Sequence, residues 1–421
     1  MTHLSEIREE TDKPDIKKKS RAGFQAGFLT GAFTVLVCTM ILAAVSGLFR
    51  RQRQGEEQSG AEVLTSQETA DKLEEIQKLI QRKALGEIDG QELSDYLFRG
   101  VAAGLDDAYA GYYTSDELTS VRESNDGAYY GIGATLSQDV NTGEIRVSTV
   151  YEDSPAALAG LQEEDQMLRL EDTSLTGMDL SDVITLIREY EGIFHLTVLR
   201  DDQETELEMA CGQVEKKTIK YEITGDDIGY IRITEFDSVT VVQFQDAVDD
   251  LMGQGVQGLI FDLRDNPGGL LTAVCDIVDY LLPEGLIVYT EDRNGVGEEY
   301  KSDDEHYVNC PMAVLVNGNS ASGSEIFAGA LQDHEAAVII GTTTYGKGVV
   351  QNTYELSDGS ALKLTVEKYY TPNGQDIDGN GITPDYVVEE GDSQEEDLPL
   401  NKALEVLKNE GAEDNFSGAA D

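Results

Sequence analysis

Tryptophan is absent from this chain of 421 residues, and cysteine and histidine are scarce, with four of each. Four cysteines are too few for a disulfide scaffold, and no Cys-x-x-Cys or Cys/His pair has the spacing of metal ligands. Neither a metal nor another cofactor is therefore predicted. The shortage of histidine also leaves few candidates for an imidazole general base.

Basic side chains are scarce as well. The chain holds 31 Lys and Arg against 81 Asp and Glu, a formal net charge of -50. A surface this acidic repels a phosphate backbone, so nucleic acid is excluded as a partner unless a local basic patch exists. Hydrophobic residues make up 40% of the chain, as in globular proteins, and the length allows two or three domains.

One long stretch, residues 22–49, has no charged side chain. It is long enough to cross a bilayer as a helix, and basic residues flank it on both sides, which favours a transmembrane helix over a buried core helix. Residues 1–53 hold nine basic and five acidic side chains, whereas the remainder holds 22 and 76. A single-pass anchor is predicted, with residues 1–21 as a cytoplasmic tail and the acidic part outside. A cleaved signal peptide is the alternative.

Composition and periodicity divide the rest of the chain. Residues 50–67 form a polar linker, and apolar residues at helical spacing predict helices in the region 68–125. These helices could serve as a stalk, as the interface of a homodimer or in packing against their own chain, and the pattern does not separate these roles. Residues 391–421 are predicted to be an acidic tail, with a short helix at 400–407.

Residues 126–212 show short strands and turns. Gly131-Ile132-Gly133 precedes a strand, and Ser154 and Pro155 supply the N-cap and first position of a short helix. This order resembles a PDZ domain. The resemblance implies that the glycine loop at Gly131, Ile132 and Gly133 offers backbone N–H groups to the C-terminal carboxylate of a peptide that adds as a strand. A β-rich domain that binds no peptide is the alternative.

Residues 213–390 alternate strands and helices, which predicts an α/β domain. Two glycine-rich stretches within this domain partly match a nucleotide-binding loop and a calcium-binding loop, but neither match is complete. Residues 341–348 lack the Ser or Thr that follows the lysine of a nucleotide-binding loop, and a strand follows them where a helix is needed. Residues 376–387 begin like a calcium loop but end in Val387 instead of a bidentate Glu.

Ser322 follows a hydrophobic strand and precedes a predicted helix. Such a turn exposes the hydroxyl and directs neighbouring N–H groups towards a substrate. A nucleophilic serine needs a base. His334 falls near the far end of the helix with nothing to orient it, whereas Lys347 lies between two glycines in apolar surroundings that would lower its pKa.

The stretches 320–333 and 345–351 closely resemble the carboxyl-terminal processing peptidases, or tail-specific proteases, and residues 233–236, 262–269, 370–374 and 381–385 match further motifs. The resemblance covers about residues 70–390. It implies an α/β catalytic core with an inserted PDZ domain, an N-terminal helical segment and one transmembrane helix. The implied activity is that of a serine endopeptidase of the bacterial cell membrane. It would cleave polypeptides with free C-termini outside the cytoplasm, with access controlled by the PDZ domain.

Matching residue by residue, the resemblance makes Ser322 the nucleophile and Lys347 the general base, with Gln351 orienting the lysine. It makes the backbone N–H groups of Gly323 and Gly268 the oxyanion donors. Most members have Ala at the position of Gly323. The family's Asp-Pro-Tyr-Ser pattern is altered here at 107–110, a departure that is expected to matter little for catalysis. A peptide-binding scaffold on an inactive core, or a signalling protease with one substrate, are the alternatives.

Overall fold

The computed structural model describes residues 63–391 and 396–417, except residue 226. The predicted cytoplasmic tail, the transmembrane segment 22–49 and most of the linker lie outside the described residues. Among the residues that are described, no helix is both long and apolar enough to cross a membrane. The chain divides into two compact units, Met1–Asp89 and Gly90–Asp421.

The described part of the first unit contains helix α2 (Gln67–Lys83). Ser66 caps its first turn, since its hydroxyl accepts a hydrogen bond from the Thr69 N–H at 3.2 Å. None of its residues is buried, and Leu73, Ile76 and Leu79 lie exposed at helical spacing. The prediction of a helix here is confirmed. Two more helices of the predicted helical region, α3 (Gly90–Ala103) and α4 (Ser115–Asp126), belong to the second unit.

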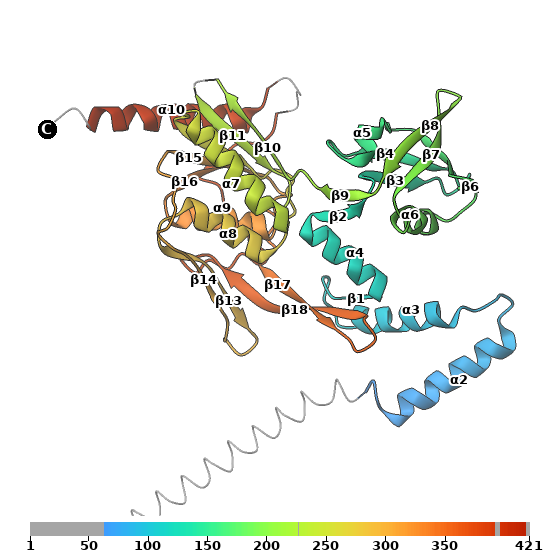
Figure 1. The fold of residues 1–421 in the computed structure, drawn as a ribbon. Coiled ribbons are helices and arrows are strands. Elements are labelled where there is room, and N and C mark those ends of the chain that lie inside the picture. Colours follow the sequence, from blue (N-terminus) through green and yellow to red (C-terminus); the bar gives the residue numbers. More distant parts are fainter. Residues whose placement is uncertain (1–62, 226, 392–395, 418–421) are drawn as a thin grey trace, which may run out of the picture. The chain divides into compact units, whose positions relative to one another are not determined.

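The PDZ segment forms an antiparallel sheet with the strand order β3-β4-β5-β7-β8, and β6 pairs with β5. The strands are β3 (Ala134–Gln138), β4 (Ile145–Val150), β5 (Gln166–Leu170), β6 (Thr173–Ser174), β7 (Ile193–Arg200) and β8 (Gln203–Ala210). Helices α5 (Pro155–Ala159) and α6 (Leu180–Arg188) accompany them, and a separate hydrophobic core fills the domain. Its link to the α/β part is the pair β2 (Ala128–Gly131) and β9 (Gly212–Glu215) (Figure 1).

Glu164 and Asp165 form a turn of the PDZ segment that contains no glycine at these two positions. Glu164 adopts a φ of 68°, in the left-handed region that glycine favours. The buried Asp165 carboxylate accepts a hydrogen bond from the Gln162 N–H at 2.9 Å and forms an ion pair with Arg200 at 2.6 Å. These contacts stabilise the turn without glycine.

The α/β part, predicted over residues 213–390, is built on a sheet with the order β10-β11-β12-β15-β16-β19, parallel except for the β10–β11 pair. Its strands are β10 (Ile219–Thr224), β11 (Ile228–Ile233), β12 (Gly258–Asp262), β15 (Met312–Val316), β16 (Ala337–Gly341) and β19 (Tyr386–Val387). Helices α7 (Ser238–Gly253), α8 (Leu271–Leu281) and α9 (Gly323–Asp333) cover one face, and α10 (Leu398–Ser417) covers the other (Figure 1). Because both faces are covered, β12 and β15 are buried along their whole length.

Helix α10 is longer than the short helix predicted in the acidic tail. It begins close to the predicted short helix but continues to Ser417, and its Ala403 and Leu407 are buried against the sheet with Ile260 and Leu315. The side chain of Asp397, just before the helix, accepts hydrogen bonds from Arg264 at 2.8 and 2.9 Å. Part of this tail is therefore a structural element of the core.

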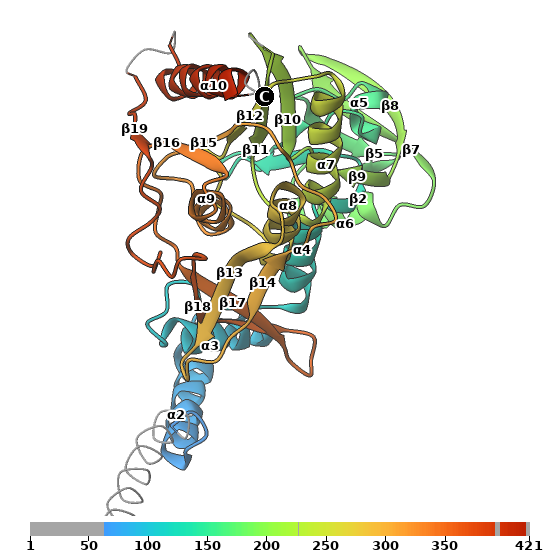
Figure 2. The ribbon, with the colours of Figure 1, turned by 90° about the vertical axis from the view of Figure 1, so that its left-hand side faces the viewer.

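A second, antiparallel sheet packs on α8 and α9, on the side of these helices that faces away from the first sheet (Figure 2). Its strands run in the order β1-β18-β13-β14, and β17 pairs with β18. They are β1 (Gly111–Tyr113), β13 (Gly285–Asp292), β14 (Glu299–Ser302), β17 (Val349–Glu355) and β18 (Ala361–Tyr370). Strand β18 pairs with β1 on one side and with β17, the strand that follows Lys347, on the other, so the start of the second unit belongs to the same sheet as β17.

Candidate active site

Ser322 lies on the turn between β15 and α9, at the carboxyl edge of the parallel strands. Its φ of 54° is in a region that residues other than glycine rarely adopt, so the surrounding structure must hold the turn. The Ser320 hydroxyl donates to the Leu263 carbonyl at 2.8 Å. The Ser324 hydroxyl donates to the Asn266 carbonyl at 3.0 Å. Both bonds tie the turn to the loop after β12.

Glu325 joins the serine turn to the lysine loop. Its carboxylate is fully buried and accepts hydrogen bonds from the backbone N–H groups of Ser322 at 2.8 Å and Lys347 at 2.9 Å. It also accepts from the Gly346 N–H at 2.7 Å and the Thr344 hydroxyl at 2.6 Å. Sequence reasoning missed this residue, although the spacing Ser-x-x-Glu at a helix start is the signal of a capping box.

Lys347 is half-buried, and its Nζ lies 4.7 Å from the centroid of the Tyr109 ring. Burial lowers the pKa of Lys347, and the positive charge of Lys363 lowers it further, while the Glu325 carboxylate acts in the opposite direction. No hydrogen bond between the Lys347 ammonium and the Ser322 hydroxyl is present among the described residues. In this conformation the ammonium contacts an aromatic face instead.

Tyr109 belongs to the altered 107–110 pattern, which was expected to matter little for catalysis. The Asp107 carboxylate accepts hydrogen bonds from the Tyr109 N–H at 2.9 Å and from the N–H and hydroxyl of Thr365 at 3.1 Å. These bonds, led by that from the Tyr109 N–H, hold the pKa of Asp107 below its ordinary value. They also fix this segment against β18, which brings the Tyr109 ring to Lys347. The contact was not predicted from the sequence.

Tyr369 and Gln351 also lie beside the lysine. The buried Tyr369 hydroxyl donates to the Lys347 carbonyl, and burial raises the pKa of this phenol well above its ordinary value. The Gln351 carboxamide donates to the Val349 carbonyl at 3.1 Å. The predicted orienting bond from Gln351 to Lys347 is therefore not formed in this conformation, although the two residues line the same cavity.

The oxyanion donors differ in part from those predicted. The Gly323 N–H, which follows the serine, has no acceptor among the described residues, but the Gly268 N–H donates to Asn266 Oδ1 at 2.8 Å. The prediction for Gly268 thus needs correction, because its donor is already used. The neighbouring Gly269 N–H has no such acceptor in the part of the chain that the structure describes. A Cβ at position 323 would lie 3.5 Å from the Gly269 nitrogen and only 3.3 Å from the Phe236 ring, so glycine also avoids a tight contact there.

A cavity of about 310 Å³ brings most of these residues together. Those that bear on catalysis are Gly269, Ser322, Gly323, Lys347, Gln351 and Tyr369. Lys363 and Tyr113 line it as well. The predicted nucleophile and base thus share one recess, and the two glycines whose N–H groups are free, Gly269 and Gly323, also line it.

His334, the other candidate base, lies at the end of α9 opposite to Ser322. Its Nε2 is 2.7 Å from the Leu286 carbonyl oxygen, and Gly285 leaves room for its ring. It does not line the cavity that contains Ser322. The structure therefore gives His334 a packing position at the base of β13.

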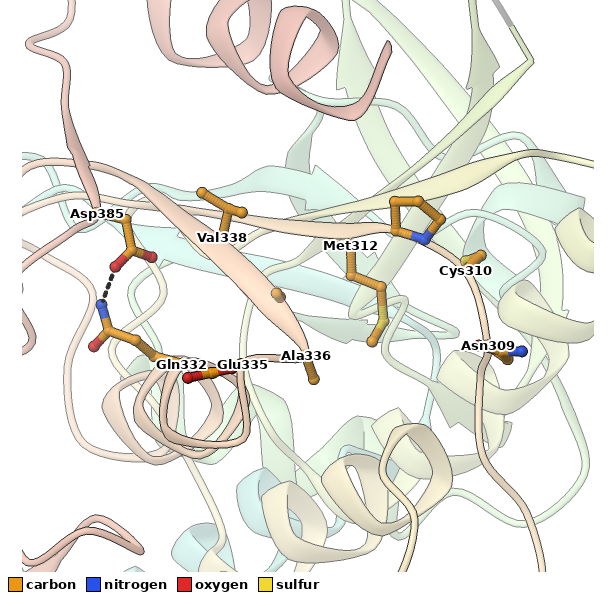
Figure 3. A pocket seen from close by; sticks show the side chains of 10 residues that line it. Asn309, Cys310, Met312, Gln332, Glu335, Ala336, Val338 and Asp385 are labelled. Atoms are coloured by element: carbon orange, nitrogen blue, oxygen red, sulfur yellow. Dashed lines mark hydrogen bonds between the residues drawn. The ribbon is translucent and has the colours of Figure 1, made fainter. Parts of the chain in front are cut away.

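A larger cavity, of about 690 Å³, lies at the amino ends of β15 and β16 (Figure 3). In it the Gln332 carboxamide donates to Asp385 Oδ1 at 2.9 Å. Among the described residues that line this cavity, Cys310 is the one with a side chain of the nucleophilic type. Burial raises the pKa of the Cys310 thiol to about 11, which keeps it protonated and unreactive near neutral pH. None of the predicted catalytic residues lines this cavity.

The predicted carboxylate loop of the PDZ segment contains two free backbone N–H groups. The carbonyls of Ile132 and Gly133 are occupied, by the Ala156 N–H at 2.7 Å and the Ser154 hydroxyl at 3.1 Å, respectively. Their N–H groups have no acceptor among the described residues. Gly133 has a φ of 81°, and a Cβ there would meet Ser154 at 2.2 Å. Gly131 instead lies in β2, and the adjacent β3 is an edge strand with α6 beside it.

A serine on a strained strand-to-helix turn, with free backbone donors and a lysine of lowered pKa in one cavity, defines the class of serine peptidases. Family models agree: residues 227–388 match peptidase family S41, and residues 120–199 match the PDZ domain. These matches confirm both parts of the resemblance.

Relatives identify the family more closely. The chain is 32% identical over 361 residues to a probable CtpA-like serine protease of Staphylococcus haemolyticus, covering 85% of this chain and 69% of the relative. It is 33% identical over 317 residues to the carboxy-terminal processing protease CtpA of Bacillus subtilis, covering 75% and 68%. A solved photosystem II D1 C-terminal processing protease is 28% identical, covering 75% of this chain and 86% of that chain with a TM-score of 0.45. On its sequence relatives, the chain belongs to the carboxy-terminal processing serine proteases of family S41.

Proposed function

We propose that Ser322 and Lys347 form the catalytic dyad of this protease, and that it cleaves the C-terminal tails of polypeptides outside the cytoplasm while anchored in the bacterial cell membrane. The observation that carries the dyad is the single Glu325 carboxylate, which holds the backbone of both residues at one cavity. The lowered pKa of Lys347 supports its role as the base.

In this mechanism the Lys347 side chain turns from the Tyr109 ring towards Ser322. The neutral amine takes the hydroxyl proton as the serine oxygen attacks the scissile carbonyl. The oxyanion is stabilised by the N–H groups of Gly323 and Gly269. The Lys347 ammonium then protonates the leaving amine, an acyl ester on Ser322 remains, and a water that gives its proton to Lys347 hydrolyses it.

Substrate tails bind first at the PDZ segment. The free N–H groups of Ile132 and Gly133 would receive the terminal carboxylate, and the peptide would extend the sheet at β3. Its preceding residues would then reach the cavity at Ser322. At the other end of β3, the Gln138 carboxamide donates to the Met178 carbonyl at 2.8 Å and accepts from the Leu180 N–H at 3.2 Å, which ties the start of α6 to this strand.

The dyad is tested by incubating the full-length protein in detergent with a polypeptide substrate and identifying the new C-termini by mass spectrometry. Cleavage should be lost in Ser322→Ala and in Lys347→Ala. If Ser322→Ala still cleaves, the nucleophile is wrong. If the wild-type protein binds a tail but does not cleave it, and the variants bind the tail equally well, the chain is a peptide-binding scaffold.

The anchor and orientation rest on the uncharged stretch 22–49 and on the charge difference across it. Protease added to intact spheroplasts should digest the acidic domain and spare a tag at the N-terminus. Protection of the acidic domain would refute the extracytoplasmic assignment. Comparing the C-termini of membrane proteins with and without the active enzyme would separate general tail processing from a single dedicated substrate.

A further inference from the structure

The cavity at Ser322 differs in charge from the chain that surrounds it. Acidic residues outnumber basic ones by 81 to 31, yet the described residues that line this cavity include two lysines and no Asp or Glu. A recess of one sign in a protein of the other sign concentrates the field on whatever enters it. The cavity therefore attracts negative charge, whereas most of the surface repels it.

Lys363 is the lysine that catalysis leaves unused. It lies on β18, directly opposite Gly111 of β1 and Thr353 of β17, so neither partner residue offers it an acidic side chain. Its Nζ is 5.5 Å from the centroid of the Tyr113 ring, and the side chain is partly buried. An ammonium held at an aromatic ring keeps its hydrogen bonds available to a ligand.

The other lysines of the same sheet are paired. Lys301 forms an ion pair with Glu299 at 2.7 Å, and Lys368 forms one with Asp378 at 3.0 Å. The ion pairs of the described residues do not include Lys363. In a chain with so many carboxylates, a lysine of the cavity lining that no described carboxylate pairs is available to an anionic group from outside.

We propose that Lys363 binds a carboxylate of the substrate next to the scissile bond, so that the protease prefers tails with negative charge at that position. The inference rests on the proposed function, because the cavity must hold the peptide during cleavage. The carboxylate comes either from an Asp or Glu side chain or from the terminal carboxylate of a tail cut close to its end. In both cases Nζ–H groups of Lys363 donate to carboxylate oxygens.

The bound carboxylate has a second effect that a merely structural lysine would not produce. The charge of Lys363 lowers the pKa of Lys347. A substrate carboxylate that neutralises Lys363 removes this influence, so the pKa of Lys347 rises in that complex. The rise of kcat with pH should therefore occur at a higher pH for an acidic peptide than for its neutral copy.

The test uses the full-length protein and peptides that differ only by Glu against Gln at each position around the cleavage site, with free or amidated C-termini. In the wild type, Glu at one position should raise kcat/KM about tenfold over Gln, mainly through KM. A preference for the free over the amidated end that Lys363→Gln abolishes, without a Glu preference, would instead identify the terminal carboxylate as the ligand of Lys363, because a preference that comes from the loop at Ile132 and Gly133 survives this substitution. Equal kcat/KM for all the peptides overturns the proposal.

Substitutions at Lys363 test whether this residue causes the preference for Glu over Gln in the peptide. Lys363→Gln should abolish it, Lys363→Arg should keep it, and Lys363→Glu should favour Lys over Gln at the same position. The ratio of rates for two peptides is compared, because a general effect on Lys347 cancels in that ratio. Lys301→Gln, which makes the same change in net charge outside the cavity, should leave the ratio unchanged. An unchanged ratio in Lys363→Gln refutes the role of this lysine.

The same experiment separates the two levels of the argument. A wild-type protein that cleaves none of the peptides and whose Ser322 is not labelled by a fluorophosphonate contradicts the proposed function. A wild-type protein that cleaves and is labelled, but does not distinguish acidic from neutral peptides, contradicts only the role of Lys363.

Discussion

The Glu325 carboxylate accepts a hydrogen bond from the Lys347 backbone N–H at 2.9 Å. The same carboxylate also accepts from the backbone N–H groups of Ser322 and Gly346, so it stabilises both the serine turn and the lysine loop. The geometry of the proposed dyad thus depends on a buried side chain that takes no part in proton transfer. Four donors surround the buried carboxylate, so its oxygens do not lack hydrogen-bond partners.

Glu325→Ala should leave these donors without a partner. We expect a loss of about 2–4 kcal/mol in the free energy of unfolding and a fall in kcat of at least about a hundredfold. Thermal unfolding and peptide cleavage measure the two effects. Glu299→Ala, which removes an exposed carboxylate, is the control and should change neither. Full activity in a folded Glu325→Ala protein would contradict the positioning role.

Tyr109 should tune the base. Tyr109→Ala opens one side of Lys347 to water, and because burial is the main cause of its lowered pKa, that pKa should rise towards the ordinary lysine value. The alkaline rise of kcat should then move to higher pH, and activity at neutral pH should fall about tenfold for each pH unit by which the rise moves. Tyr109→Phe keeps the ring and should keep the profile. Identical profiles for the Ala variant and the wild type would refute this role.

The PDZ segment should bind tails through their terminal carboxylate. In the inactive Ser322→Ala protein, an amidated peptide should bind about tenfold more weakly than its free-acid copy, because the N–H groups of Ile132 and Gly133 lose a charged acceptor. Isothermal titration calorimetry measures both affinities. Equal affinities would show that the loop does not receive a carboxylate.

The assignment of the Gly269 N–H, instead of the Gly268 N–H, as an oxyanion donor makes the turn at Asn266 important for kcat. Asn266→Ala removes the acceptor of the Gly268 N–H and should loosen the turn that presents Gly269. We expect kcat to fall about tenfold with little change in KM, as for a donor used only in the transition state. If kcat is unchanged although the Asn266 carboxamide is gone, this turn does not supply an oxyanion donor.

Sequence reasoning identified the residues that are marked by local signals. Ser322 follows a buried strand and opens a helix, Lys347 lies between glycines, and the Gly131–Gly133 stretch precedes a strand, so each could be found from its neighbours. These signals predicted the α/β core, the PDZ segment and the two residues of the proposed dyad, which the structure brings to one cavity.

The residues it missed are placed by tertiary structure. Tyr109 reaches Lys347 only because Asp107 bonds to Thr365 on β18, and Lys363 enters the cavity only because β18 pairs with β1 and β17. The Gly268 N–H is occupied, and the Gly269 N–H is left as the candidate oxyanion donor, because the rotamer of Asn266 brings its carboxamide oxygen to Gly268. The extent of α10 was missed because its buried residues are few and acidic residues surround them.

The central claim is that Lys347 is the base for Ser322, and the rate at which a fluorophosphonate labels Ser322 as a function of pH tests it most directly. The account predicts a rate that rises towards alkaline pH with a midpoint below the ordinary lysine value of about 10.4. This rise should be absent in Lys347→Ala and Lys347→Arg, because neither side chain can accept the proton, and unchanged in His334→Ala. A rise centred at about pH 6–7 that is lost in His334→Ala, or a profile that survives in Lys347→Ala, would contradict the account.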